Sequence, residues 1–186
     1  MSDTENKFKK LTKPLPIESI DFRVQSINKG GYATILAYKD ARVDMQRLDE
    51  AVGFLNWKRE HIRENKNCIV SIYDESKCQW VSKEDTGTVS MAEAEKGLAS
   101  DSFKRACFNW GIGRELYDYP VISVKLQQKE FKDVSGKMKA TWDLKIREWK
   151  WVSRFDENGK LLLLAGKDQN GKLRFEHGDL NLLKEK

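Results

Sequence analysis

The sequence has few of the residues that build disulfide frameworks or metal sites. Its three cysteines, Cys68, Cys78 and Cys107, are odd in number and widely spaced, which argues against a disulfide framework and favours a reducing cytoplasm. The two histidines, His61 and His177, are distant in sequence, and no Cys-x-x-Cys pair occurs. We therefore expect no metal and no cofactor.

Long apolar runs and catalytic signatures are also missing. No run approaches the ~20 apolar residues that cross a bilayer, and the N-terminus lacks the hydrophobic region of a signal peptide. No nucleophile elbow, phosphate loop or dinucleotide fingerprint occurs. A membrane protein and the commonest classes of enzyme are therefore not expected.

Charge is what the chain has in abundance. Charged residues make up 34% of the 186 residues, and the net charge is +5. The excess is local, because residues 121–154 contain nine Lys or Arg and four Asp or Glu. Such a basic stretch indicates a polyanionic partner or a solvated strand face, and charge alone does not decide between them.

The spacing of apolar residues predicts one α+β domain over 17–175, between a flexible tail at 1–16 and a second tail at 176–186. The expected order is β-β-α-β-β-α followed by further strands. The elements are two strands at 20–25 and 32–38, a helix at 43–52, strands at 68–73 and 79–90, a helix at 91–112, and strands from 120 onward.

Short-range signals locate the ends of these elements. Asp40 or Asp44 is the expected N-cap of the first helix, and Gly53 its end. Ser90 with Glu93 forms a capping-box pattern for the second helix. Turns are expected at Asn28–Gly31, Asp74–Ser76, Asp133–Gly136, Asp156–Gly159 and Asp168–Gly171.

The second helix combines an apolar face with two adjacent cations. Its apolar face is expected to contain Ala99, Phe103, Ala106 and Trp110. Neighbouring residues on a helix point about a hundred degrees apart, so Lys104 and Arg105 flank this stripe. Partly desolvated cations of this kind bind phosphates, although an ordinary exposed pair has the same pattern.

A long strand is expected from Thr141 to Phe155, where aromatic and basic residues interleave. It carries Trp142, Leu144 and Ile146 on one face and Lys145 and Arg147 on the other. Strict alternation would place Trp149 and Trp151 beside these cations as stacking platforms for bases. A bulge near Glu148 would return both tryptophans to the core, and we favour that interpretation because Trp is usually highly buried.

One pattern suggests an enzyme instead. Asp118, Asp143 and Lys145, with a further acid–basic pair at Glu148 and Lys150, are similar to the acidic and lysine elements of Mg²⁺-dependent nucleases. Such triplets are common by chance on charged strands, so this reading remains an alternative.

Two blocks of sequence resemble the Rad52 family of single-strand annealing proteins, particularly its bacteriophage branch. The first is YKDARVDMQRLDEAVGFLNW at 38–57. The second contains EDTG at 84–87, SDSFKRA at 100–106 and GIGRELYD at 111–118. The resemblance runs from about Leu11 to Asp118, and the order and spacing of the blocks are hard to obtain by chance.

This resemblance implies a curved antiparallel sheet packed on a long helix, assembled into rings or helical filaments. Single-stranded DNA would lie in a basic groove, with Lys104 and Arg105 on its backbone and Ser100 nearby. Neither ATP nor a metal is needed. The implied partners are single-stranded DNA and further copies of the chain, with a phage exonuclease or a single-strand binding protein as candidates, in the bacterial host cytoplasm if the protein is phage-encoded.

The chain also departs from the family pattern. An arginine that follows the cation pair in eukaryotic members is replaced by Phe108, and the helix before the first strand and the C-terminal partner-binding region are not expected. Residues 121–186 match only in strand character, so Lys145 and Arg147 are DNA-binding candidates from the charge pattern alone. The expected function is ATP-independent annealing in recombination and repair, with a nuclease or a passive DNA- or RNA-binding module as the alternatives.

Overall fold

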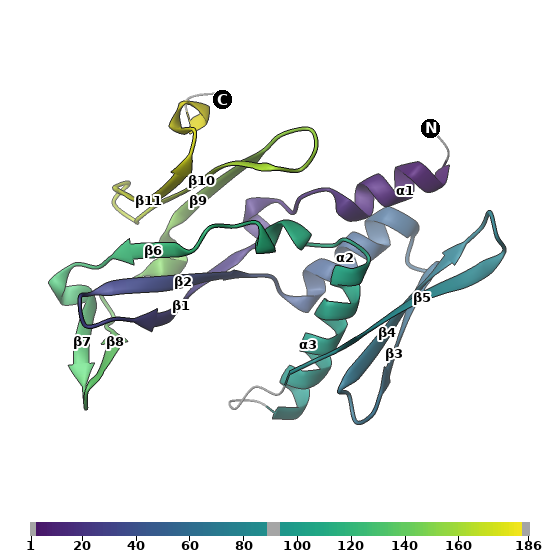
Figure 1. Ribbon diagram of the computed structural model, residues 1–186, viewed down its shortest axis with the longest axis horizontal. Helices are drawn as coiled ribbons and strands as arrows, with labels where there is room; N and C mark the ends of the chain where they lie inside the picture. Colours follow the sequence, from purple (N-terminus) through teal and green to yellow (C-terminus); the bar gives the residue numbers. More distant parts are fainter. Residues whose placement is uncertain (1–2, 89–93, 184–186) are drawn as a thin grey trace. The chain divides into compact units, whose positions relative to one another are not determined.

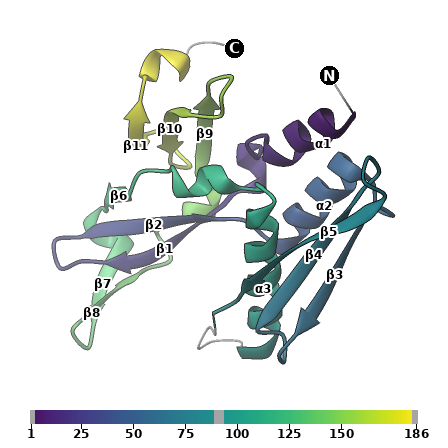
Figure 2. The same ribbon diagram turned by 45° about the vertical axis from the view of Figure 1, so that its right-hand side comes forward.

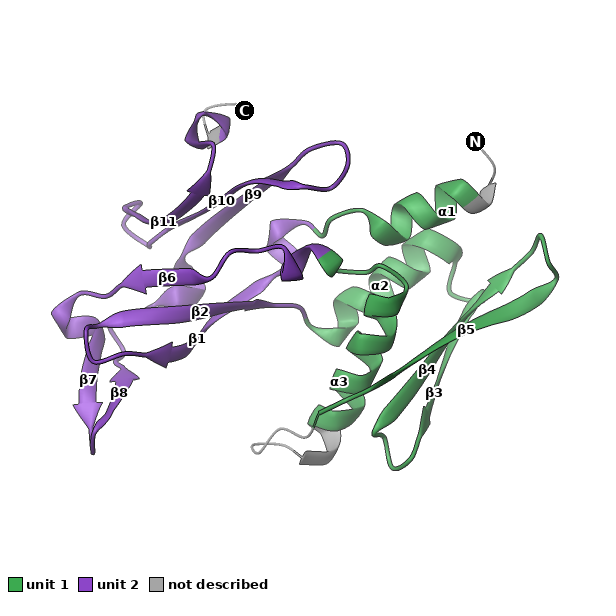
Figure 3. Ribbon diagram, viewed as in Figure 1, with its two compact units in different colours: residues 1–15, 40–114 green, residues 16–39, 115–186 purple. Residues whose placement is uncertain are grey.

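The computed structural model describes residues 3–88 and 94–183 of the chain. These residues form two units, where the sequence predicts one domain over 17–175 (Figure 3). Unit 1 contains residues 1–15 and 40–114, and unit 2 contains residues 16–39 and 115–186. Unit 2 is therefore built from two segments that flank most of unit 1 in the sequence.

Unit 1 is an antiparallel sheet with helices. Its elements are α1 (Asp3–Thr12), α2 (Ala41–Val52), β3 (Trp57–Ile62), β4 (Asn67–Asp74), β5 (Gln79–Thr86) and α3 (Ala94–Asn109). The strand order is β3-β4-β5, and α3 runs along one face of this sheet (Figures 1 and 2). The sheet has one strand more than expected, because β3 was not predicted as a separate element.

The core of unit 1 lies between α3 and the sheet. On β4, Cys68, Val70 and Ile72 alternate along one face and are buried. Phe103 of α3 and Trp110, the first residue after α3, are buried too, and the Trp110 indole N–H donates to the carbonyl of Val70 at 3.0 Å. The helical apolar face that the sequence predicts is therefore the face that packs on the sheet, although Ser90 and Glu93, its expected capping box, lie outside the described residues.

Helix α2 begins and ends as its sequence predicts. Asp40 is the N-cap and accepts a hydrogen bond from the Arg42 amide at 2.8 Å. Gly53 ends the helix with φ +87°, a left-handed conformation that favours glycine. Of the two candidate caps, Asp40 is therefore the one used, while Asp44 is buried within the first turn.

Helix α1 was not expected, because residues 1–16 read as a tail and no helix was expected before the first strand. Leu11 is its buried anchor, only 1% exposed. Arg47 of α2 donates to the carbonyls of Lys10 and Lys13 at the C-terminal end of α1. The helix is thus held by a side chain 34 to 37 residues away, which local sequence patterns do not reveal.

Unit 2 consists mainly of short antiparallel strands. They are β1 (Asp21–Ile27), β2 (Tyr32–Tyr38), β6 (Ile122–Lys125), β7 (Phe131–Val134), β8 (Lys137–Ala140), β9 (Lys150–Phe155), β10 (Leu161–Lys167) and β11 (Leu173–Gly178). They form the sheets β1-β2-β6 and β11-β10-β9 and the hairpin β7-β8. Short 3-10 helices are η1 (Ile17–Ser19), η2 (Arg114–Tyr117, at the junction of the units), η3 (Gln128–Glu130), η4 (Ile146–Glu148) and η5 (Leu180–Leu183). Strand β11 and η5 occupy much of the expected C-terminal tail.

Aromatic rings form the centre of unit 2. Phe22 of β1 stacks on Trp151 of β9, with ring centroids 4.0 Å apart and planes 7° from parallel. Trp149 and Trp151 are 6% and 9% exposed, and their rings lie 6.0 Å apart. Both tryptophans are therefore core residues, as we favoured over base-stacking platforms.

The predicted strand Thr141–Phe155 is wrong over its first nine residues. The chain turns at 141–144 and forms η4, and only residues 150–155 are a strand. Trp142 is consequently 97% exposed and does not share a sheet face with Leu144, which is buried. The Thr141 amide still bonds to the Glu130 carbonyl at 3.0 Å, at the end of the β7–β8 hairpin, but the Leu144 amide then donates back to the Thr141 carbonyl at 3.3 Å and closes a turn.

The expected turns are all confirmed as connections between neighbouring antiparallel strands. None of the three cysteines forms a disulfide, and Cys68 and Cys107 are buried whereas Cys78 is exposed. Across residues 3–88 and 94–183, every helix is too short or too polar to cross a membrane.

Candidate nucleic-acid interface

The outward side of α3 carries the cation pair that the sequence predicts. Lys104 and Arg105 flank the buried stripe and are themselves half-buried. Ser100 and Asp101 precede them by one helical turn and are also half-buried. The structure thus brings Ser100, Lys104 and Arg105 together on one side of one helix.

Arg105 is fixed by a carboxylate on the preceding turn. Its Nε–H donates to Oδ2 of Asp101 at 3.3 Å, and the Arg105 side chain keeps 42% of its surface exposed. Its two terminal nitrogens make no hydrogen bond to any residue in the described part of the chain. Asp101 therefore orients the guanidinium group and leaves its outer edge available for a bidentate contact with an anion.

Asp101 is held ionised by its surroundings. Burial opposes its negative charge, but hydrogen bonds from the Thr88 amide at 2.9 Å and the Thr88 hydroxyl at 3.2 Å outweigh burial. The positive charges of Arg105 and Lys104 act in the same direction, so the pKa of Asp101 lies below its usual range. The carboxylate thus remains a fixed acceptor at neutral pH.

Lys104 is the less restrained of the two cations. It makes no ion pair with any residue that the structure describes, although its positive charge helps to lower the pKa of both Asp40 and Asp101. The pKa of Asp40 is lowered mainly by hydrogen bonds from the Arg42 amide and side chain, and less by Lys104. A half-buried ammonium group without a close counterion attracts an anion more strongly than a fully solvated one.

The glycine of the EDTG motif serves the packing of this helix. A Cβ atom on Gly87 would lie 2.8 Å from the Ser102 amide nitrogen and 2.9 Å from the Leu98 carbonyl oxygen. Two residues earlier, Asp85 accepts a hydrogen bond from the Asn109 side chain at 3.2 Å. The motif therefore fixes the end of β5 against α3, next to Thr88 and its bond to Asp101.

Other cations of unit 1 face α3 and were not found by sequence reasoning. Arg59 lies 4.8 Å from the centre of the Phe103 ring, and Lys83 lies 4.7 Å from the centre of the Trp110 ring. Lys83 also donates to the Asn109 carbonyl at 2.7 Å, and burial, assisted by Arg114, lowers its pKa. The alternation of residues along a strand could have identified them, because it places Arg59 and Lys83 on the strand faces toward the helix. Both cations support the packing of α3.

Lys145 and Arg147, the other two predicted contacts, belong to unit 2. Both are exposed in the segment around η4, not on a strand. Lys145 pairs with Glu148 at 3.5 Å, and both partners remain about half exposed, so this ion pair is weak. Arg147 has no ion pair with any residue in the described ranges.

The structure lacks the strand on which the nuclease alternative depends. Asp143 and Lys145 lie in the turn and short helix that replace the expected strand. Asp118 lines a cavity of about 550 Å³ together with Lys160 and His177, and Asp143 is not among the lining residues. Within 3–88 and 94–183, no three His, Cys, Asp or Glu side chains are grouped so that they could hold a metal ion.

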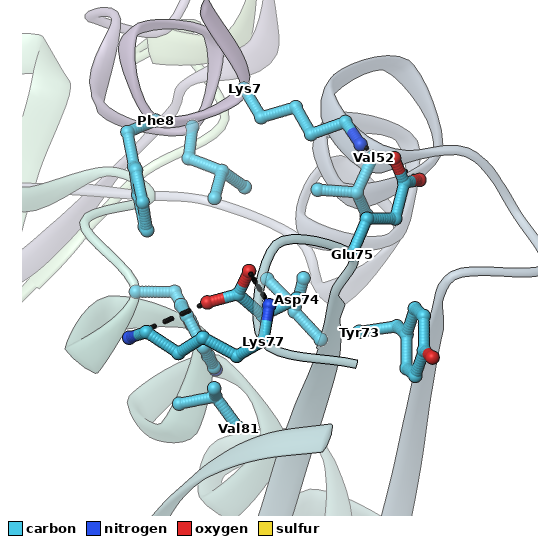
Figure 4. Close-up of a pocket in the computed structure, with 11 residues that line it drawn as sticks. Lys7, Phe8, Val52, Tyr73, Asp74, Glu75, Lys77 and Val81 are labelled. Carbon is cyan, nitrogen blue, oxygen red and sulfur yellow. Dashed lines mark hydrogen bonds and ion pairs between the residues drawn. The ribbon is translucent and has the colours of Figure 1, made fainter. Parts of the chain in front are cut away.

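An apolar cavity of about 120 Å³ lies elsewhere in unit 1 (Figure 4). Phe8 of α1, Val52 of α2 and Val81 of β5 are among the residues that line it. At its rim, Lys7 pairs with Glu75 at 3.0 Å and Lys77 pairs with Asp74 at 3.5 Å. Because these lysines already have carboxylate partners, the cavity offers less to a phosphate than the α3 face does.

Comparison with known proteins identifies a family. Residues 3–135 match the Rad52/22 family, described as double-strand break repair proteins. The chain is 34% identical over 116 residues to the single-stranded DNA-binding protein DdrA of Deinococcus radiodurans, covering 60% of this chain and 55% of that protein. It is 33% identical over 115 residues to the protein of the same name from Deinococcus deserti, covering 60% and 57%.

The chain spans little more than half the length of these two curated relatives. The matched region includes α3 with Lys104 and Arg105 and ends before Trp142, Lys145 and Arg147. The bacteriophage branch is not tested by these matches and stays a prediction. Since the match to the family covers well over half of the sequence, the chain belongs to the Rad52/22 family of double-strand break repair proteins.

Proposed function

We propose that this protein binds single-stranded DNA and anneals complementary strands without ATP, in recombination and repair. The observation that carries the proposal is the half-buried side of α3, where Lys104 has no ion pair within the described residues and Arg105 presents its outer edge. Membership of the Rad52/22 family and the likeness to two single-stranded DNA-binding proteins support it.

The proposed mechanism is electrostatic and needs no covalent step. Lys104 and Arg105 bind backbone phosphates and release condensed counterions, which also reduces the repulsion between two strands. The Ser100 hydroxyl, one turn from Lys104, adds a hydrogen bond to the same backbone. Contacts to the backbone leave the bases free to pair, so base pairing and stacking drive formation of the duplex.

Two further parts of the proposal concern residues and partners outside this helix. Exposed Lys145 and Arg147 of unit 2 are proposed as additional phosphate contacts. Assembly into rings or filaments would align the α3 faces of successive copies, so that one strand contacts many subunits. A nuclease or a single-strand binding protein is a candidate partner, since annealing requires exposed single strands.

The test is an annealing assay with two fluorescently labelled complementary oligonucleotides. We expect Lys104→Ala with Arg105→Ala to slow annealing at least tenfold. We also expect it to reduce the slope of log affinity against log salt by about 1.4, since each phosphate contact to a single strand contributes about 0.7. The matched control is Lys9→Ala with Lys10→Ala, which removes the same charge from α1.

The outcomes separate the possible functions. Wild-type binding without faster duplex formation would indicate a passive binder, and cleavage of the oligonucleotide in Mg²⁺ would indicate a nuclease. Unchanged annealing by the Lys104 and Arg105 double variant, with its fold verified by circular dichroism, would remove α3 from the site. A monomeric mass with and without the oligonucleotide would contradict the proposed assembly.

A further inference from the structure

The β7–β8 hairpin of unit 2 carries three lysines on one face. Residues directly opposed in an antiparallel pair project to the same side. The register pairs Lys132 with Lys139 and Val134 with Lys137, so these four residues share a face that has no acidic residue. The three lysines are exposed. This hairpin therefore presents a small, uniformly basic surface.

The hairpin keeps this face at a cost to its own stability. Like charges directly opposite each other, as Lys132 and Lys139 are, destabilise a strand pair, and an isolated two-stranded hairpin is marginal in water. The hairpin is anchored by its other face, where the ring of Phe131 packs so closely on Gly31 that a Cβ atom there would lie 2.7 Å away. In both views the hairpin extends to a free tip (Figures 1 and 2).

Trp142 follows the hairpin after one intervening residue and is 97% exposed. The backbone beneath it is fixed, because the Thr141 amide donates to the Glu130 carbonyl at 3.0 Å and the Leu144 amide donates to the Thr141 carbonyl at 3.3 Å. Leu144 is buried and anchors the turn. A tryptophan held in solvent on an anchored turn is unusual, since its large ring is normally buried.

Most acidic residues near the hairpin are already engaged, and the exception is exposed Asp143 next to Trp142, which has no ion pair with any described residue. Glu130 is buried in an ion pair, and Asp133 accepts a hydrogen bond from the turn amide of Gly136 at 2.7 Å. Glu148 pairs with Lys145 at 3.5 Å. The remaining exposed charge of this region is therefore predominantly positive, which suits a polyanion.

We propose that the lysine face of the hairpin and Trp142 form a second contact for single-stranded nucleic acid. Lys132, Lys137 and Lys139 bind phosphates, and the Trp142 ring stacks on a base. An unstacked base is available in a single strand and not within a duplex, so this surface favours single strands. The proposal rests on the proposed function for its ligand, and it adds a surface that α3 does not provide.

The first test measures binding of a labelled oligothymidylate to the full chain by fluorescence anisotropy. We expect Trp142→Ala to weaken binding about tenfold, in line with the loss of one stacked base, and Trp142→Phe to retain most of the affinity. The oligonucleotide should also quench tryptophan fluorescence in the wild type, and this quenching should be largely absent in Trp142→Phe.

The second test uses Lys139→Glu, which places an opposite charge across from Lys132. We expect the unfolding midpoint in urea to rise while affinity for the oligonucleotide falls at least threefold, because the strand pair improves and the phosphate contact is lost. Lys167→Glu is the matched control, since it makes the same charge change at an exposed site on β10. Damage to the fold would lower stability and affinity together.

The outcomes distinguish this inference from the function on which it rests. If the wild type fails to bind the oligonucleotide, both are wrong. If the wild type binds, and Trp142→Ala and Lys139→Glu bind as tightly as it does, the hairpin surface is overturned while the proposed function stands. The hairpin surface is supported if Trp142→Ala binds more weakly and Trp142→Phe restores binding. It is also supported if Lys139→Glu raises stability while it lowers affinity.

Discussion

Arg105 donates its Nε–H to the carboxylate of Asp101, one helical turn earlier, at 3.3 Å. The same oxygen accepts both hydrogen bonds from Thr88, so a single acidic group joins the end of β5 to the candidate phosphate-binding cations. It also places a negative charge where a phosphate would approach. Asp101 thus orients Arg105 and weakens the positive field at the same time.

Replacing Asp101 separates these two effects. Asp101→Asn keeps the size of the side chain and can still accept from Thr88, but it removes the charge. We expect the free energy of unfolding to fall by about 1 kcal/mol, a modest value because Arg105 is partly exposed. Affinity for a single-stranded oligonucleotide should rise about threefold at low salt, and the gain should disappear near 1 M salt. Urea unfolding and anisotropy measure the two quantities.

The control for this change is Glu60→Gln, which removes the same charge from an exposed position on β3. It should leave both stability and affinity close to those of the wild type. Weaker binding by Asp101→Asn at low salt would mean that orienting Arg105 matters more than the local charge, contrary to our expectation.

A buried ion-pair cluster in unit 2 gives a prediction about pH. Arg174 binds Glu130 in a bidentate manner, at 2.8 and 3.0 Å, and contacts Asp168 at 3.3 Å, and all three side chains are at most 5% exposed. Burial opposes ionisation of both acids, but hydrogen bonds from Arg174 and backbone amides outweigh it and lower both pKa values. Their stabilising effect is therefore present above the pKa values of the unfolded chain, about 4, and is lost as pH falls through the lower folded values.

Arg174→Met should reverse this dependence. The variant leaves two buried carboxylates without their cation, so we expect a loss of about 3–5 kcal/mol in the free energy of unfolding at pH 7. The loss should be smaller at pH 4.5, because the pKa values of the two acids then rise and protonation relieves the uncompensated charge. Urea unfolding at both pH values tests this, with exposed Arg154→Met as the control. An equal loss at both pH values would contradict it.

The distance in sequence between contacting residues explains why some elements are predicted and others are not. Some predictions depend only on residues next to each other in the sequence, and these are confirmed. They include the turns at Asn28–Gly31 and Asp156–Gly159 and the cap at Asp40. The strand expected from Thr141 fails because the Leu144 amide bonds back to the Thr141 carbonyl and turns the chain, next to Glu130, whose side chain is held by Arg174, 44 residues away. No local pattern encodes this last contact.

Strand β3 escaped prediction for a related reason. Its helix-facing positions are Trp57, Arg59 and His61, which oppose the buried residues of β4. The Arg59 guanidinium group lies over the Phe103 ring, so a charged residue occupies a helix-facing position. An alternation of apolar and polar residues does not reveal such a strand. In the α3 site, by contrast, the flanking position of Lys104 and Arg105 followed directly from helical geometry, while the Asp101 contact with Thr88 did not.

The cysteines should differ sharply in reactivity. Cys68 is fully buried, and burial raises the pKa of its thiol to about 11, whereas Cys78 is exposed on the β4–β5 turn. Because the thiolate is the reactive form, Ellman's reagent at pH 8 should label Cys78 rapidly and Cys68 and buried Cys107 only after unfolding. Cys78→Ser should abolish the fast phase. Labelling of all three thiols at one rate would show that the unit 1 core opens readily.

Gly166 of β10 lies directly opposite Trp151, whose ring covers it. A Cβ atom on Gly166 would lie 2.7 to 2.9 Å from three atoms of the six-membered ring of that indole. The ring cannot easily shift, because Phe22 stacks on it at 4.0 Å and Trp149 lies 6.0 Å away. We therefore expect Gly166→Ala to lower the free energy of unfolding by about 1–3 kcal/mol and to change the near-ultraviolet circular dichroism of the tryptophans.

A double-mutant cycle shows whether this cost arises from the contact with Trp151. In a Trp151→Phe background the ring is smaller and can withdraw from residue 166, so Gly166→Ala should cost less than in the wild type, with a coupling free energy of about 1 kcal/mol. A general loss of strand flexibility on replacing glycine would be equal in both backgrounds and would give no coupling. Equal costs would thus refute the steric explanation, whereas a reduced cost identifies the ring of Trp151 as the reason for glycine at this position.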